Sequence, residues 1–200
     1  PPATLLGQHK GAPLFTAIKE MQENLDRLAL EEKERKWSIE GQAIISDILN
    51  RYNHDFEQLS KQIIRGLVKY TNSLQGALFV IDKNQKGNSQ HLEMVSSYAF
   101  DRFNKIEKKI EIGQGILGQV WMENKGVYME NIPEDHMRIK SFTGSSRPKS
   151  ILIETLVDNS EFYGVIELAS LKTFSSFERD FVKKIAKNIA ATLATVENNN

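Results

Sequence analysis

Three closely spaced glycines are the residues of this chain whose spacing most directly suggests chemistry. Gly113, Gly115 and Gly118 fit the pattern G-x-G-x-x-G, and Val120 extends it to the G-x-G-x-x-G-x-V of a protein-kinase phosphate loop. In loops of this kind, backbone amides at the start of a helix hold the phosphate groups of a nucleotide. Taken alone, the pattern predicts a nucleotide site.

The sequence that surrounds the glycines favours a structural role. A dinucleotide fold needs a long crossover helix and a parallel return strand, but Gly126 ends the helix predicted for residues 116–123 after barely two turns. The kinase motifs V-A-I-K, H-R-D and D-F-G do not follow. Glycine also serves tight turns that need a positive φ or a close backbone approach. We therefore interpret the motif as a strand-to-helix turn, whose helix presents to a core the side chains of Ile116, Leu117, Val120 and Trp121.

Other residue types that carry out catalysis are missing or poorly spaced. The chain has no cysteine, which excludes disulfides, thiolate metal sites and a catalytic thiol. No G-x-S-x-G nucleophile motif occurs. The four histidines, His9, His54, His91 and His136, form no i, i+4 pair, so we predict no metal site. Of these, His136 alone falls in a loop that could line a pocket.

Composition narrows the classes of partner. The 200 residues include 26 acidic and 26 basic side chains, a formal net charge of zero, so we expect no nucleic-acid partner. Neither a signal peptide nor an apolar run of the ~20 residues that span a bilayer occurs, which predicts a cytoplasmic chain with no direct membrane insertion. The parent protein could still be membrane-anchored. The Pro-Pro start and the Asn-Asn-Asn end suggest a piece of a longer protein.

The periodicity of apolar residues predicts the elements. Residues 1–13 are expected to be loose, and residues 14–40 to form a helix with a heptad seam. This helix should pair with a second copy of itself or with the C-terminal helix, the alternative being a helix that lies across its own domain. Two more helices follow, at residues 37–52 and after the capping residue Asp55.

Six strands are then predicted, at residues 76–82, 91–100, 108–112, 127–132, 150–157 and 163–171, with a hairpin turn at residues 158–160. Ser175 and Glu178 form a capping box that starts the last helix. This order of elements indicates an α+β fold with an antiparallel sheet.

Two segments carry a family resemblance. Residues 113–133 (GQGILGQVW…GVYMENIP) and 163–178 (YGVIELAS…F…FE) together resemble the GAF domain family of small-molecule sensors, which is related in shape to PAS domains. The resemblance is closest to modules of bacterial multidomain signalling proteins. It implies a GAF/PAS-like six-stranded antiparallel sheet flanked by helices over residues 41–197, with residues 198–200 as a tail. It also implies a non-catalytic module, because the pigment-binding and sulfoxide-reducing relatives use cysteine.

The resemblance further implies a ligand between one sheet face and the helices and loops that link the middle strands. No cofactor is certain, and the ligand is an unknown small molecule. A cyclic nucleotide is not favoured, because Lys172 and Phe174 match that branch but its asparagine and Asp-Glu pair are missing. The hydroxyl-rich loop at residues 141–147 is interpreted as a lid. The candidate ligand-binding residues are Phe79, Ser97, Gly115, Ile116, Gln119, Trp121, Met137, Ile139, Ser141, Thr143, Arg147 and Glu167.

We expect a homodimeric regulatory module of a signalling protein such as a sensor histidine kinase of a two-component system. Its partners would be the ligand, a second copy and the other domains of the parent protein. One alternative is a ligand-free dimerisation scaffold, its pocket filled by Phe79, Met94, Met129, Met137 and Phe142. Another is an enzyme that holds a nucleotide in the glycine loop. The residues expected to dimerise and transmit the signal are Leu14, Ile18, Met21, Leu25, Leu28, Ile189, Leu193 and Val196.

Overall fold

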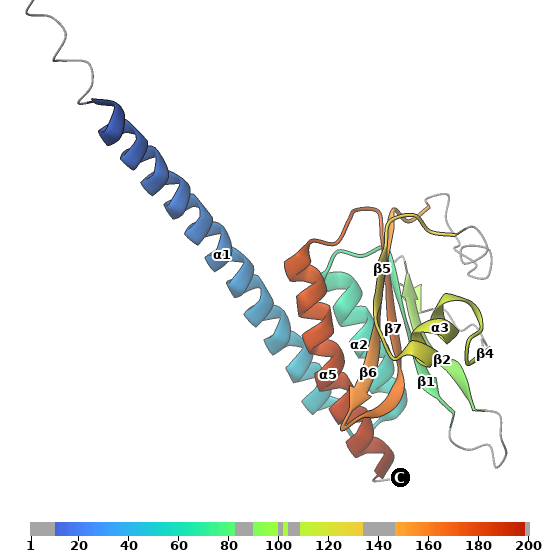
Figure 1. Ribbon diagram of the computed structural model, residues 1–200. Helices are drawn as coiled ribbons and strands as arrows, with labels where there is room; N and C mark the ends of the chain where they lie inside the picture. Colours follow the sequence, from blue (N-terminus) through green and yellow to red (C-terminus); the bar gives the residue numbers. More distant parts are fainter. Residues whose placement is uncertain (1–10, 83–89, 100–101, 104–108, 134–146, 199–200) are drawn as a thin grey trace, which may run out of the picture. The chain divides into compact units, whose positions relative to one another are not determined.

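The computed structural model describes residues 11–82, 90–99, 102–103, 109–133 and 147–198, and in them an antiparallel sheet flanked by helices (Figure 1). The helices are α1 (Gly11–Arg51), α2 (Phe56–Tyr70), α3 (Gly115–Glu123) and α5 (Ser176–Asn198). The strands are β1 (Gln75–Ile81), β2 (His91–Ala99), β3 (Arg102–Phe103), β4 (Lys109–Glu111), β5 (Val127–Met129), β6 (Ser150–Asp158) and β7 (Glu161–Ser170).

The strands lie in the order β3-β2-β1-β7-β6-β5, and β4 pairs with β2. Every strand pair in the described residues is antiparallel. The six predicted strands and the α+β class are therefore confirmed. Sequence reasoning missed β3, because two residues are too short to show an alternation. The predicted hairpin turn between β6 and β7 is also present, with Asn159 and Ser160 both at positive φ.

The two helices predicted before residue 53 are one continuous helix, α1, and this prediction was wrong. Residues 11–13, which were expected to be loose, also belong to α1. Gly41 lies inside this continuous helix, where a Cβ would collide with the ring of Tyr70 and lie 2.6 Å from that of Phe181. Glycine is thus required there by close packing. The chain divides into two compact units, Pro1–Glu40 and Gly41–Asn200.

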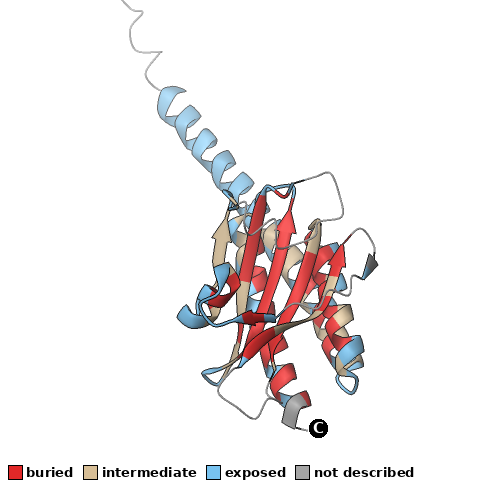
Figure 2. Cartoon of the chain, turned by 90° about the vertical axis from the view of Figure 1, so that its right-hand side faces the viewer, coloured by how far each residue is buried: buried red, intermediate tan, exposed pale blue. Residues whose placement is uncertain are grey.

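Within the second unit, helices cover both faces of the sheet. The helices α2 and α5 pack on one face and the short α3 packs on the other (Figure 1). Figure 2 shows that buried residues are concentrated in the strands between these layers. No described helix combines the length and the apolar composition that crossing a membrane requires. We call the side of the sheet that contacts α2 and α5 the helix face, and the opposite side, which contacts α3, the α3 face.

The apolar stripe of helix α5 is buried within this chain. Ile189, Leu193 and Val196, which we expected to contact a partner, are buried in this chain. Because their side chains already pack inside the domain, they are not available to a second copy, and they leave the predicted transmission surface. The stripe covers the sheet and does not also meet a partner through these residues.

The start of α5 is tied to the sheet by a small polar network. The Glu178 carboxylate accepts hydrogen bonds from the Ser175 amide (2.8 Å) and from Lys172 Nζ (2.8 Å), and the Glu178 amide donates to Ser175 Oγ. The predicted capping box is thus confirmed. Ser150 Oγ on β6 donates to the Lys172 carbonyl at 2.6 Å. Burial by itself would raise the pKa of Glu178, but the hydrogen bonds from Lys172 and Ser175 lower it below its ordinary value.

Candidate functional site

The glycine turn folds back on itself. Gly113 and Gly115 have φ values of 76° and 60°, which side chains rarely adopt. The Gly113 amide donates to the Gly118 carbonyl at 2.8 Å, and the Gly118 amide donates to the Gln114 carbonyl at 3.0 Å. A Cβ on Gly118 would collide with the Glu111 carbonyl oxygen. The amides of Gly113 and Gly118 are therefore used in hydrogen bonds within the turn, and the turn leaves no room for a side chain at Gly118.

The strands on either side of this turn exclude a dinucleotide fold. β4 precedes the turn and pairs antiparallel with β2, whereas β5 follows α3 and pairs antiparallel with β6. A dinucleotide site needs parallel strands joined by a crossover helix. The nine-residue α3 ends at Glu123, and its C-terminal capping residue Asn124 is in the left-handed conformation. The structural interpretation of the G-x-G-x-x-G motif is confirmed.

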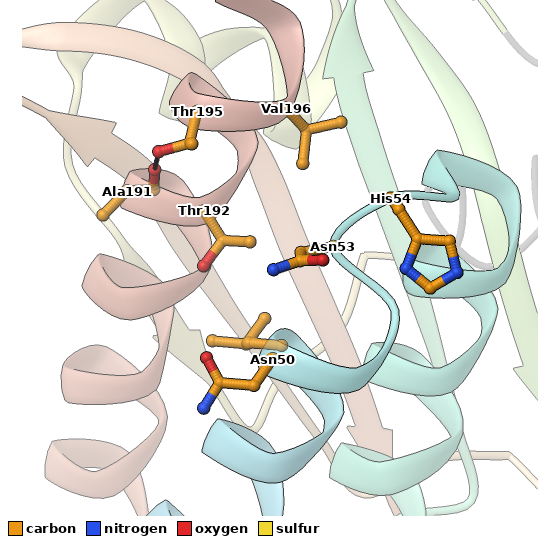
Figure 3. A pocket seen from close by; sticks show the side chains of 8 residues that line it. Asn50, Asn53, His54, Ala191, Thr192, Thr195 and Val196 are labelled. Carbon is orange, nitrogen blue, oxygen red and sulfur yellow. Dashed lines mark hydrogen bonds between the residues drawn. The ribbon is translucent and has the colours of Figure 1, made fainter. Parts of the chain in front are cut away.

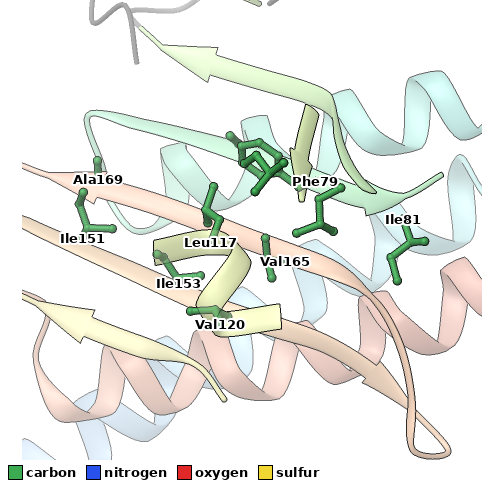
Figure 4. Close-up of a cluster of buried hydrophobic side chains, with 11 residues drawn as sticks. Phe79, Ile81, Leu117, Val120, Ile151, Ile153, Val165 and Ala169 are labelled. Atoms are coloured by element: carbon green, nitrogen blue, oxygen red, sulfur yellow. The ribbon is translucent and has the colours of Figure 1, made fainter. Parts of the chain in front are cut away.

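Helix α3 covers a cluster of apolar side chains on its face of the sheet (Figure 4). Leu117 and Val120 are buried in it, as predicted, while Ile116 and Trp121 pack against it. The Trp121 ring stacks on Phe162 with 5.9 Å between centroids and 12° between planes. The buried members of the cluster are Ala77, Phe79, Ile81, Leu92, Ile110, Leu117, Val120, Ile151, Ile153, Val165 and Ala169.

A single carboxylate lies in the middle of this apolar floor. Glu167 on β7 pairs with Ala77 of β1 on one side and with Ile153 of β6 on the other. Because Ala77 and Ile153 belong to the cluster under α3, the Glu167 side chain lies on the same face. Only 1% of Glu167 is exposed. A carboxyl group is thus buried where its paired neighbours on the two adjacent strands are apolar.

The structure brings together only some of the predicted ligand-binding residues. Phe79, Ile116, Trp121 and Glu167 share the α3 face, and Ser97, partly buried, pairs with Ala77 on that face. Gln119, Gly115 and Arg147 are exposed. Met137, Ile139, Ser141 and Thr143 lie outside the described residues, as do Phe142, most of the predicted lid and His136. Of the proposed gap-filling methionines, Met94 and Met129 pack against the cluster.

A groove that we did not predict lies on the helix side (Figure 3). It has a volume of about 610 Å³ and runs between the end of α1 and the last turns of α5. Its lining mixes side chains that carry amide, imidazole and hydroxyl groups with apolar ones, so it offers both hydrogen bonds and apolar contacts. Its lining residues are Leu49, Asn50, Asn53, His54, Ala191, Thr192, Thr195 and Val196.

A second unpredicted group joins the ends of β1 and β2. Asp82, His91 and Glu93 place one ligand-type atom each within 4.8 Å of one another. The available signal was the spacing His91-x-Glu93, which puts both side chains on one face of a strand, after a strand that ends at an aspartate. Helical i, i+4 spacing does not detect a cross-strand arrangement of this kind.

The sequence profile of the GAF domain family matches residues 53–194. Similar solved structures include the GAF domain of an Acinetobacter phosphoenolpyruvate-protein phosphotransferase, 13% identical, with a TM-score of 0.62 over 80% of this chain and 95% of that one.

A free methionine-R-sulfoxide reductase from Neisseria meningitidis, in complex with its substrate, is 14% identical with a TM-score of 0.63, over 82% of this chain and 93% of its own. The A. aeolicus Nlh2 GAF domain in an inactive state is 17% identical with a TM-score of 0.58, over 80% and 98%. Comparison with curated protein sequences gives no match. The family match covers most of the chain, and the architecture of the solved structures agrees with it, so this chain belongs to the GAF domain family.

Proposed function

We propose that this chain is a non-catalytic, cytoplasmic regulatory module that binds a small molecule on the α3 face of its sheet. The observation that carries the proposal is the burial of Glu167 among apolar residues. The GAF fold is known for small-molecule sensing and regulation, which supports the general role. The ligand class, the dimeric state and the signalling output are the parts that we propose.

Burying a carboxylate is costly unless complementary groups surround it. A carboxyl group on this face offers a ligand a hydrogen-bonding group that an apolar side chain at position 167 would not. Small-molecule sites are typically mostly apolar with a few placed polar groups, so we take Glu167 as the polar contact of the proposed site. The ligand that it suits carries an ammonium, a guanidinium or a similar donor group, and apolar parts that match Phe79 and Trp121.

The chain's composition supports a non-catalytic role. Several similar structures are free methionine-R-sulfoxide reductases. The resemblance drawn from the sequence attributes such activity to cysteine, and this chain has none. A sulfoxide reductase mechanism that depends on a thiolate nucleophile is therefore unavailable to these residues.

The proposed output is a homodimer joined through α1, as part of a signalling protein such as a sensor histidine kinase. The heptad residues of α1, from Leu14 to Leu28, are each at least 51% exposed in the single chain. A narrow apolar seam on an otherwise charged helix is typical of a coiled coil. In this proposal the ligand shifts the equilibrium between two arrangements of the domain only by its differential affinity for them.

Native mass spectrometry of the protein purified from cells tests ligand binding. We expect added mass on the wild type that is lost in Glu167→Gln, because the neutral amide keeps the shape but not the charge. Glu111→Gln removes an exposed carboxylate and should retain the added mass. In a parallel thermal-shift screen of amines and amino acids, a compound that binds should raise the melting temperature of the wild type and leave that of Glu167→Gln unchanged. If neither experiment detects a ligand for the wild type, the scaffold is the better account.

A further inference from the structure

The end of the β1–β2 pair places three potential metal ligands on the helix face of the sheet. Ile81 and Leu92 pair with each other and belong to the cluster under α3. Their neighbours Asp82, His91 and Glu93 therefore lie on the opposite face, because side chains alternate along a strand. The Asp82 amide donates to the His91 carbonyl at 3.0 Å, which fixes these two residues directly across from each other.

His91 is buried with an unused polar atom. Its side chain is 8% exposed, and Nε2 has no hydrogen-bond partner within the described part of the chain. The closest acidic atom is Asp82 Oδ2 at 3.7 Å, which is too long for a hydrogen bond. A buried ring nitrogen without a partner is costly, so the position of His91 calls for a group between Nε2 and the nearby carboxylates.

We propose that Asp82, His91 and Glu93 bind a divalent transition-metal cation of the Zn²⁺ type. Ligand bonds of about 2.0–2.1 Å in a tetrahedral site put neighbouring ligand atoms about 3.3–3.4 Å apart. The 3.7 Å between His91 Nε2 and Asp82 Oδ2 is close to this value. All three ligand atoms already lie within 4.8 Å of one another, and small rotations of the two carboxylates bring them to bonding distance.

The ligand set selects the class of metal. Imidazole suits Zn²⁺ and similar ions, whereas all-oxygen sites suit Mg²⁺ and Ca²⁺. Two carboxylates also neutralise a divalent charge, which offsets the cost of holding the ion beside the buried His91. Asp82 and Glu93 are only partly buried, so water can complete the coordination. A site that joins Asp82, which follows the last residue of β1, to His91 and Glu93 of β2 stabilises this end of the β1–β2 pair.

Titration of the EDTA-treated full chain with Co²⁺ and Zn²⁺ tests the site. Co²⁺ gives visible d–d absorption that reports its ligands, and Zn²⁺ affinity follows from competition. We expect one equivalent of Co²⁺ to bind and Zn²⁺ to displace it. Because Asp82 and Glu93 are partly exposed, Asp82→Asn and Glu93→Gln should keep the fold and weaken binding roughly tenfold or more, as losses at metal sites commonly do. His91→Gln should abolish the Co²⁺ spectrum.

Glu111→Gln is the matched control. Glu111 is the β4 residue paired with His91, and it is an exposed carboxylate outside the group of three. We expect its loss to change Co²⁺ affinity by less than a few-fold. Equal weakening by Glu111→Gln and Glu93→Gln would show a general effect of charge and overturn the site. Unchanged binding in Asp82→Asn, Glu93→Gln and His91→Gln, or no saturable binding at millimolar metal, would overturn it as well.

Discussion

Gly118 provides the sharpest test of the structural role of the glycine turn. Inside a helix, Gly→Ala normally stabilises by up to ~1 kcal/mol. At Gly118 the new Cβ would collide with the Glu111 carbonyl oxygen and lie 3.0 Å from the backbone nitrogen and carbon of Gly113. These are backbone atoms in a turn closed by the Gly113-to-Gly118 hydrogen bond, so they cannot rotate away as a side chain would.

Overpacking costs typically ~1–3 kcal/mol, and a backbone collision belongs at the upper end. Subtracting the ~1 kcal/mol gain in helix propensity leaves a net loss of about 2 kcal/mol for Gly118→Ala. Urea denaturation followed by circular dichroism measures this difference. The neighbouring variant Gln119→Ala changes an exposed side chain of the same helix and should stay within about 0.5 kcal/mol of the wild type. A Gly118→Ala protein as stable as the wild type would refute the packing argument and reopen a ligand-contact role for the motif.

Two further predictions concern the terminal helices. Leu25→Glu should shift the proposed dimer toward monomer in sedimentation velocity without lowering the unfolding midpoint of the domain, because Leu25 is 60% exposed in the single chain; unchanged dimers would contradict a seam through α1. Leu193→Glu, by contrast, buries a charge and should unfold the domain.

The lowered pKa of Glu178 contributes stability that is fully present above its ordinary value of 4.5 and is lost as the pH falls through the folded-state pKa. The stability difference between the wild type and Glu178→Gln should therefore shrink in acid, and a difference independent of pH would contradict the network around Lys172.

The sequence predicted most of the fold because its signals are local. Alternating apolar residues located six strands, and the Ser175–Glu178 spacing located the start of α5 to within one residue. The division of α1 into two helices was wrong because the heptad seam lapses at the charged residues 31–36, yet these residues continue the helix. Gly41 is tolerated within it because it packs closely against Tyr70 and Phe181, which are far away in the sequence. Propensity describes what a glycine costs a helix, whereas tertiary packing decides whether that cost is accepted.

The site was harder to predict because a β-bulge controls which side chains face the ligand. The register shifts between Leu78 and Phe79, so Phe79 pairs with Met94 but Ala77 pairs with Ser97. An unbroken alternation from His91 would have put Ser97 on the helix face, and the bulge returns it to the α3 face beside Glu167. Nothing in the local sequence marks this shift. The possible metal ligands Asp82, His91 and Glu93 come from two segments of the chain, so no local spacing within the sequence indicates all three.

The position of Glu167 explains how binding on one face could reach a helix on the other. β7 lies between β1 and β6, so a ligand that contacts Glu167 contacts the central part of the sheet. In the segment that follows Ser170, the last residue of β7, Ser175 and Glu178 cap α5. Lys172 donates to Glu178, and its carbonyl accepts a hydrogen bond from Ser150 of β6. The link between strand and helix is thus held by hydrogen bonds to both elements and is short and stiff. In the proposed mechanism, a displacement of β7 relative to β6 is opposed or favoured by this network, and α5 follows because its first turn is part of it.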